Sequence, residues 1–124
     1  MKQAKIDKQG VVLISCGSFN PPTNLHLHLL ESAKDYFEKV QGKDVLLGVI
    51  SPVHDGYGKK GLLPAKNRME MVKICTDDSK WISHDIWELS QPQYSTTVKV
   101  LRHVNENVKK NQNFPENVGF FIKF

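Results

Sequence analysis

The sequence predicts an α/β protein with a parallel sheet, and three observations indicate it. Residues 11–14 (Val-Val-Leu-Ile) form an unbroken apolar run, typical of a strand covered on both faces, although periodicity alone would also allow a buried helix. Apolar residues then recur at helical spacing from residue 23 to about residue 40. A second wholly apolar run follows at residues 45–50. Strand, helix and strand in this order predict a βαβ unit, whose ligands would bind beyond the carboxyl ends of its strands.

The connection after the first run has the features of a phosphate-binding loop. Gly17 and Ser18 interrupt the apolar pattern, and Asn20-Pro21-Pro22 predicts an extended turn. Thr23 is the candidate N-cap of the helix, so backbone N–H groups and the positive end of the helix dipole converge on the loop. A Gly-Ser pair by itself is more often a plain turn.

The remaining elements continue the pattern. Gly42 ends the first helix, and Pro64 suits an early position in the next one. That next helix should place Met69, Val72 and Cys75 on one face. The predicted elements beyond residue 62 are this helix, a third strand with its exit, an amphipathic helix and an apolar stub that could start a fourth strand, at residues 65–76, 81–88, 94–108 and 118–124.

Composition excludes several classes of protein. The chain of 124 residues suits one small domain, and a net charge of +4 without dense Lys/Arg runs gives no sign of a nucleic-acid-binding arm. Two cysteines are too few for a disulfide scaffold, and no apolar run suits a signal peptide or a membrane span. The five histidines lie at no spacing typical of zinc, so we expect no protein metal site. We expect an intracellular protein, cytoplasmic or nuclear and not secreted, with neither nucleic acid nor a membrane as its partner.

Two loops carry the candidate site residues. His26 follows Thr23 by three positions, so its ring lies at the first helical turn and could donate to a phosphoryl oxygen; the alternative is a partly buried helix residue. Residues 54–61 are rich in glycine and lysine, and could close over a phosphate or simply face water. Arg68 could anchor its helix near the site, with a structural role favoured.

Here the sequence resembles a known family. Gly17-Ser18-Phe19-Asn20-Pro21 followed by Thr23-Asn24-Leu25-His26 is similar to the signature of the nucleotidyltransferase superfamily, a Gly-x-Phe-x-Pro loop before a (His/Thr)-x-Gly-His motif. Leu25, in place of the usual glycine, resembles the animal nicotinamide mononucleotide adenylyltransferases. Further matches continue in the same order to about residue 103, at residues 50–53, Asp55, Tyr57, residues 59–62, Arg68, Trp81, Asp85, residues 87–88, Thr97 and residues 99–103.

The resemblance implies a Rossmann-like, doubly wound parallel sheet of the nucleotidyltransferase type. Residues 1–10 would be a polar tail, residues 11–108 the first part of the domain, and residues 109–124 a linker and apolar stub. The family's Ile-Ser-x-Thr-x-x-Arg segment, which binds the ATP triphosphate, does not occur in these 124 residues. We therefore expect the domain to be incomplete at its C-terminal side, and the chain alone not to sustain the complete reaction.

The reaction implied is transfer of AMP from ATP to nicotinamide mononucleotide, giving NAD and pyrophosphate; the deaminated acid form of the mononucleotide is the alternative acceptor. Mg²⁺ would enter with ATP, and the full-length protein would be a homo-oligomer. The implied catalytic residues are His26 and Lys60, and the implied substrate-binding residues are Gly17, Ser18, Phe19, Thr23, Tyr57, Lys59, Trp87, Tyr94 and Thr97. Alternatives are a nucleotidyltransferase for pantetheine phosphate or phosphocholine-like acceptors, against which Leu25 and the Tyr57 to Lys60 loop argue, and a non-catalytic binding or regulatory fragment.

Overall fold

The structure is a computed structural model that describes residues 9–57, 60–93, 95–110 and 119–123. Its centre is a four-stranded, wholly parallel sheet in the order β3-β2-β1-β4. The strands are β1 (Gly10–Gly17), β2 (Asp44–Pro52), β3 (Ile82–His84) and β4 (Gly119–Lys123). The chain winds outward from β1 in both directions, which is the Rossmann-like arrangement expected from the sequence.

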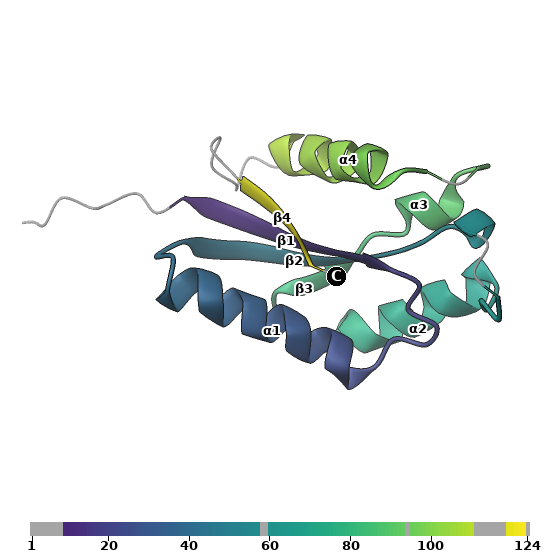
Figure 1. The fold of residues 1–124 in the computed structure, drawn as a ribbon, viewed down its shortest axis with the longest axis horizontal. Helices are drawn as coiled ribbons and strands as arrows, with labels where there is room; N and C mark the ends of the chain where they lie inside the picture. Colours follow the sequence, from purple (N-terminus) through teal and green to yellow (C-terminus); the bar gives the residue numbers. More distant parts are fainter. Residues whose placement is uncertain (1–8, 58–59, 94, 111–118, 124) are drawn as a thin grey trace, which may run out of the picture.

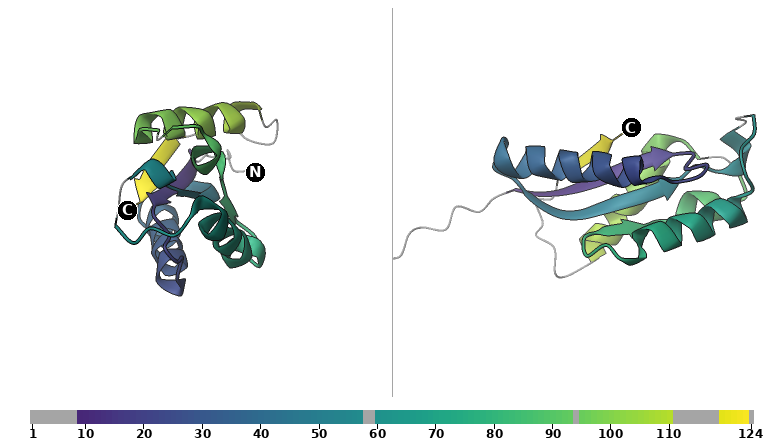
Figure 2. Two further views of the ribbon diagram at one scale, coloured as in Figure 1. Left: turned by 90° about the vertical axis from the view of Figure 1, so that its right-hand side faces the viewer. Right: turned by 90° about the horizontal axis from the view of Figure 1, so that it is seen from below.

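Helices cover both faces of the sheet (Figures 1 and 2). On one face lie α1 (Asn24–Lys39) and α2 (Ala65–Asp77), and on the other lie α3 (Trp87–Ser90) and α4 (Thr97–Lys110). A short 3₁₀ turn, η1 (Asp55–Tyr57), follows β2. None of the helices in these described ranges is long and apolar enough to cross a membrane.

The pleat of β1 divides its apolar run between two cores. Val11 and Leu13 pack toward α1 and α2, whereas Val12 and Ile14 pack toward α4 with Val104 and its neighbours. All four strand residues are at most 1% exposed because both faces of the sheet are covered. The prediction of a two-sided buried strand is confirmed.

The first helix begins and ends where its signals predicted. Thr23 is its N-cap with an extended backbone, and Lys39 is its last residue. Gly42 adopts a φ of 63°, in the left-handed region that glycine tolerates, and Lys43 N–H then donates to the Phe37 carbonyl. The βαβ prediction is confirmed by the parallel pairing of β1 with β2.

The third strand is shorter than the sequence suggested. It ends at His84, and Asp85 turns the chain into α3 by accepting the Trp87 N–H at 2.9 Å on its carboxylate. Trp87 and Glu88 are therefore helical residues. The helix expected from residue 94 begins at Thr97, after Thr96 Oγ1 accepts the Lys99 N–H.

Two further details refine the expectations. The apolar stub at residues 118–124 contributes β4, which pairs with β1 from Val11 to Ser15. The buried stripe of α2 consists of Arg68, Val72 and Thr76. Of the predicted apolar face, Val72 is therefore buried, whereas Met69 and Cys75 lie half-buried beside the stripe. A charged side chain thus occupies a core position at the start of α2.

Candidate nucleotide-binding site

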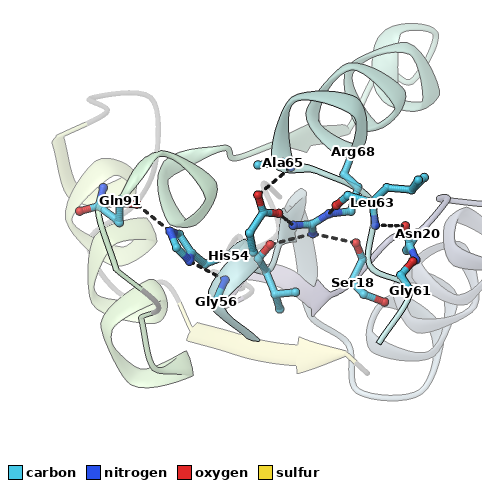
Figure 3. A network of polar contacts seen from close by, with 11 residues as sticks. Ser18, Asn20, His54, Gly56, Gly61, Leu63, Ala65, Arg68 and Gln91 are labelled. Carbon is cyan, nitrogen blue, oxygen red and sulfur yellow. Dashed lines mark hydrogen bonds and ion pairs between the residues drawn. The ribbon is translucent and has the colours of Figure 1, made fainter. Parts of the chain in front are cut away.

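The loops after β1 and β2 meet at the carboxyl edge of the sheet, as predicted. Val53 N–H donates to the Gly17 carbonyl at 2.8 Å, which extends the strand pairing by one bond. The Asn20 side chain then clamps the second loop: Nδ2 donates to the Gly61 carbonyl at 2.9 Å and Oδ1 accepts the Leu63 N–H at 2.8 Å (Figure 3). The two loops therefore form one unit with a fixed separation.

Arg68, near the start of α2, holds these two loops together through its side chain. Its side chain is fully buried and uses three different nitrogens. Nε donates to the Leu63 carbonyl at 2.8 Å, and Nη1 donates to the carbonyls of Ser18 and Val53 at 3.0 and 2.7 Å (Figure 3). The guanidinium thus satisfies carbonyls from the first loop, the end of β2 and the segment before α2.

The fourth contact of Arg68 is an ion pair. Nη2 donates to Asp55 Oδ1 at 2.7 Å, and Asp55 Oδ2 accepts the Ala65 N–H at 3.1 Å. Burial acts to raise the pKa of the Asp55 carboxyl, but the hydrogen bonds from Arg68 and Ala65 and the charge of Arg68 outweigh it, so the pKa lies below its usual value. Asp55 therefore ties η1 to the first turn of α2.

His26 is held in one tautomer at the N-terminus of α1. The Thr23 N–H donates to His26 Nδ1 at 2.9 Å, in a capping-box arrangement with histidine at the N3 position. Since Nδ1 accepts, a neutral ring carries its proton on Nε2. The Phe19 ring supports the imidazole edge-on, with centroids 4.9 Å apart.

Phe19 has a structural position that the sequence did not reveal. Its side chain is 2% exposed and belongs to the core under α1, and its φ is 45°. A non-glycine residue in this region is uncommon and concentrates at functional loops. Its ring lies against the backbone of Gly17, where an added Cβ would meet it at 3.5 Å. The buried ring therefore fixes the path of the loop.

On the other face, aromatic and acidic residues gather at the end of β3. The Trp87 indole stacks on the His103 ring, with centroids 4.6 Å apart and planes at 13°. His103 Nε2 also lies 3.3 Å from Asp85 Oδ2. These contacts join α3 and the end of β3 to the middle of α4.

Glu88 is buried, only 3% exposed, between α3 and the exit of β2. Burial raises the pKa of its carboxyl to about 7, and the nearby Asp85 adds to the effect, while a hydrogen bond from the His54 backbone N–H and the charge of Arg68 act against it. Burial, followed by the charges of Glu88 and Asp85, likewise raises the pKa of the Cys16 thiol to about 12. Cys16 is thus a packed thiol and not a reactive one.

The structure describes some of the predicted site residues in full, others by their backbone only, and two not at all. Gly17, Ser18, Thr23 and His26 lie together at the meeting of β1 and α1, and Lys60 is exposed in the neighbouring loop. The backbone of Tyr57 ends η1 and that of Thr97 begins α4. Lys59 and Tyr94 lie outside the described residues.

The structure adds residues that were not among the predicted site members, namely Asn20, His54, Arg68 and Glu88. One sequence signal could have marked Arg68 as central: it stands four and eight positions before Val72 and Thr76, on the buried stripe of its helix. Within the described ranges, no group of three or more His, Cys, Asp and Glu side chains could hold a metal ion.

Comparison with known proteins identifies the family of this chain. The sequence model of one family, described as cytidylyltransferase-like, matches residues 14–121. The chain belongs to the cytidylyltransferase-like family. This places the Gly-Ser loop, α1 and the sheet of the present structure within a family fold that includes nucleotidyltransferases.

This cytidylyltransferase-like chain is also similar to curated relatives. It is 48% identical over 103 residues to nicotinamide/nicotinic acid mononucleotide adenylyltransferase 1 of Bos taurus, which covers 83% of this chain and 37% of that protein. It is 44% identical over 103 residues, with 83% and 34% covered, to nicotinamide/nicotinic acid mononucleotide adenylyltransferase 2 of Danio rerio. It is 48% identical over 93 residues, with 75% and 24% covered, to nicotinamide-nucleotide adenylyltransferase of Drosophila melanogaster. The chain spans about a quarter to just over a third of the length of these relatives.

Proposed function

We propose that the protein is a nicotinamide mononucleotide adenylyltransferase, which transfers AMP from ATP to nicotinamide mononucleotide and releases NAD and pyrophosphate. The observation that carries this is the His26 tautomer: Thr23 N–H occupies Nδ1, which leaves Nε2–H as a donor at the positive end of α1 beside the Gly-Ser loop. The names of the similar proteins support the choice of acceptor.

In this reaction the protein needs only to align the two substrates and to stabilise the negative charge on their phosphates. An oxygen of the mononucleotide phosphate, already anionic at neutral pH, attacks the α-phosphorus of ATP. A new P–O bond forms there, and the bond from the α-phosphorus to the bridging oxygen breaks, so pyrophosphate leaves with the electron pair. No general base is needed, and in-line positioning with donors around the phosphates supplies the catalysis.

On the ATP side, His26 Nε2–H, the backbone amides of Gly17 and Ser18, and Lys60 would surround the phosphates. Thr23 would act through His26 by holding its tautomer, and Phe19 by fixing the loop path. ATP would enter as its Mg²⁺ complex. The metal would be held mainly by phosphate oxygens, as Mg²⁺ in phosphoryl-transfer sites commonly is.

On the mononucleotide side, the proposed contacts come from η1 and from the chain around α3 and α4. Tyr57 and Lys59 would bind the phosphate and ribose, while Tyr94 and Thr97 would bind the nicotinamide. Trp87 would contribute from α3; because one face of its indole already stacks on His103, only its edge or opposite face would remain for a substrate.

The test is binding and turnover with a panel of nucleotides. Calorimetry with the 124-residue chain should detect nicotinamide mononucleotide and Mg²⁺-ATP, with weaker or no binding of pantetheine phosphate, phosphocholine and CTP. NAD formation is then assayed side by side with the 124-residue chain and with a longer form that carries the family's Ile-Ser-x-Thr-x-x-Arg segment. A folded chain that binds neither proposed substrate, or that prefers another acceptor, would contradict the proposal; binding of both substrates by the longer form without turnover would favour the non-catalytic alternative.

A further inference from the structure

His54 is the junction between the exit of β2 and α3. Its ring accepts the Gly56 N–H on Nδ1 at 2.8 Å, and Nε2 lies 2.8 Å from the Gln91 carbonyl oxygen (Figure 3). Its backbone N–H donates to the Glu88 carboxylate. One residue therefore makes a bond to η1 and two bonds to α3 and its C-terminal end.

These contacts define the protonation state of the ring. A backbone N–H can only donate, so Nδ1 must present its lone pair, whereas a carbonyl can only accept, so Nε2 must carry the proton. The bonded form is the neutral ring. Because an imidazole is rigid, its two bonds also fix the distance between Gly56 and Gln91.

We propose that His54 is a positioning residue, which in its neutral, Nε2-protonated form holds η1 at a set distance from the end of α3 and thereby prepares the mononucleotide half of the site. This rests on the proposed function, since Tyr57 ends η1 and the chain from Gln91 leads to Thr97. We call the two ring contacts of His54, with Gly56 and with Gln91, the His54 latch. The ATP half of the site should be independent of this latch, because Arg68 and Asn20 hold the loop after β1.

The bond from Gly56 depends on the lone pair of Nδ1. A ring that carried its proton on Nδ1 would present a donor to the Gly56 N–H donor, so this bond would be lost.

The experiment compares four variants of the 124-residue chain by calorimetry with nicotinamide mononucleotide and with Mg²⁺-ATP. His54→Ala removes both ring bonds, His54→Asn can keep an acceptor for Gly56, and His54→Gln can keep a donor for Gln91. His28→Ala, at an exposed position on α1, is the matched control. The substrate phosphate titrates equally in all of them, so differences between variants isolate the ring.

His54→Ala should weaken mononucleotide binding about fivefold, with ATP binding changed less than about twofold, and Asn and Gln should each restore part of the loss. Equal weakening toward both ligands, unchanged mononucleotide binding, or no recovery with either amide would overturn the inference.

A second readout does not depend on substrate. Nitrogen-15 NMR of the unmodified chain at neutral pH should find His54 Nδ1 unprotonated and Nε2 protonated. A ring protonated on Nδ1 would refute the latch. If the ring behaves as stated but no nucleotide binds, the proposed function fails and the latch stands as a structural junction.

Discussion

Arg68 Nη2 and Asp55 Oδ1 lie 2.7 Å apart, yet the arginine side chain is fully buried while the aspartate side chain is half exposed, at 51%. An ion pair with one solvated partner contributes little by itself. The larger effect lies in the three carbonyls that the same guanidinium satisfies, since buried carbonyls without a donor are costly.

Arg68→Lys should therefore destabilise the protein although it keeps the charge. A lysine ammonium is a single point and cannot reach the Leu63, Ser18 and Val53 carbonyls together. We expect a loss of about 3 kcal/mol in the free energy of unfolding, measured by urea denaturation. Arg102→Lys, exposed on α4, is the control and should change stability by less than about 0.5 kcal/mol. If Arg68→Lys lowered the free energy of unfolding by no more than the control does, the Leu63, Ser18 and Val53 carbonyls would have to find other hydrogen-bond donors.

Gly48→Ala should disrupt the packing of β2 against Trp81. A Cβ at position 48 would lie 2.7 Å from a ring carbon of Trp81, closer than real Cβ contacts allow. The indole is itself held by Glu31, which accepts its N–H at 2.7 Å. Overpacking of this kind costs about 1–3 kcal/mol. Thermal and urea denaturation should show this loss.

The matched test of that explanation is a double variant. If the clash with the indole is the cause, Gly48→Ala should cost much less in a Trp81→Leu background, where the ring is absent. Additive losses in the double variant would point instead to the strand backbone.

Glu88→Gln should change the pH dependence of stability. The folded pKa of Glu88, about 7, lies above its ordinary value of 4.5, so the folded state binds the proton more tightly than the unfolded state. The stabilisation from Glu88 is therefore complete below pH 4.5 and is lost as pH rises toward 7. At pH 8, removal of the charge by glutamine should raise the free energy of unfolding by about 3 kcal/mol.

The measurement is denaturant unfolding of both proteins across this range. The difference between Glu88→Gln and the unmodified protein should shrink from pH 8 to pH 4.5. Asp55 acts in a separate, more acidic pH range. Because the pKa of its carboxyl is lowered in the folded state, its contribution to stability is lost as the pH falls below the ordinary pKa of an aspartate. A constant difference between pH 4.5 and 8 would contradict the assignment to Glu88.

His26→Ala should affect turnover far more than folding. Loss of a single preorganised donor to a transition state typically lowers the rate about 100-fold or more. The capping-box bond to the Thr23 N–H is also lost, which should cost about 1 kcal/mol of stability. NAD formation is measured in a full-length form that carries the change, and urea unfolding in the 124-residue chain. His28→Ala, two positions along the same helix, serves as control in both. Near-normal NAD formation would exclude the proposed role.

The parts of the fold that follow from local pattern were predictable from sequence. The apolar runs around Val12 and Val49 and the helical spacing after Thr23 each determine an element without reference to distant residues. The four residues of α3 could not be found this way, because one helical turn shows no periodicity and depends on Asp85 accepting the Trp87 N–H.

The candidate site was predictable where it follows a motif, as for Gly17, Ser18 and His26. The residues that hold the site loops in place were not predictable from the sequence. Arg68 is buried because three loop carbonyls need donors at one point, and that requirement appears only when the loops are assembled. The same holds for the contact between His54 and Gln91, which lie 37 positions apart and meet only in the fold.

The position of β1 between β2 and β4 has a consequence for how the chain acquires its structure during synthesis. Val11 pairs with Val45 on one side and with Gly119 on the other. The nearer pairing can form once β2 has left the ribosome, whereas the distant one closes a much longer loop and must wait for residues 119–123. Until then, the apolar β1 presents an unpaired edge that another nascent chain could occupy. Aggregation during translation should therefore be most sensitive to the interval between completion of α4 and arrival of β4.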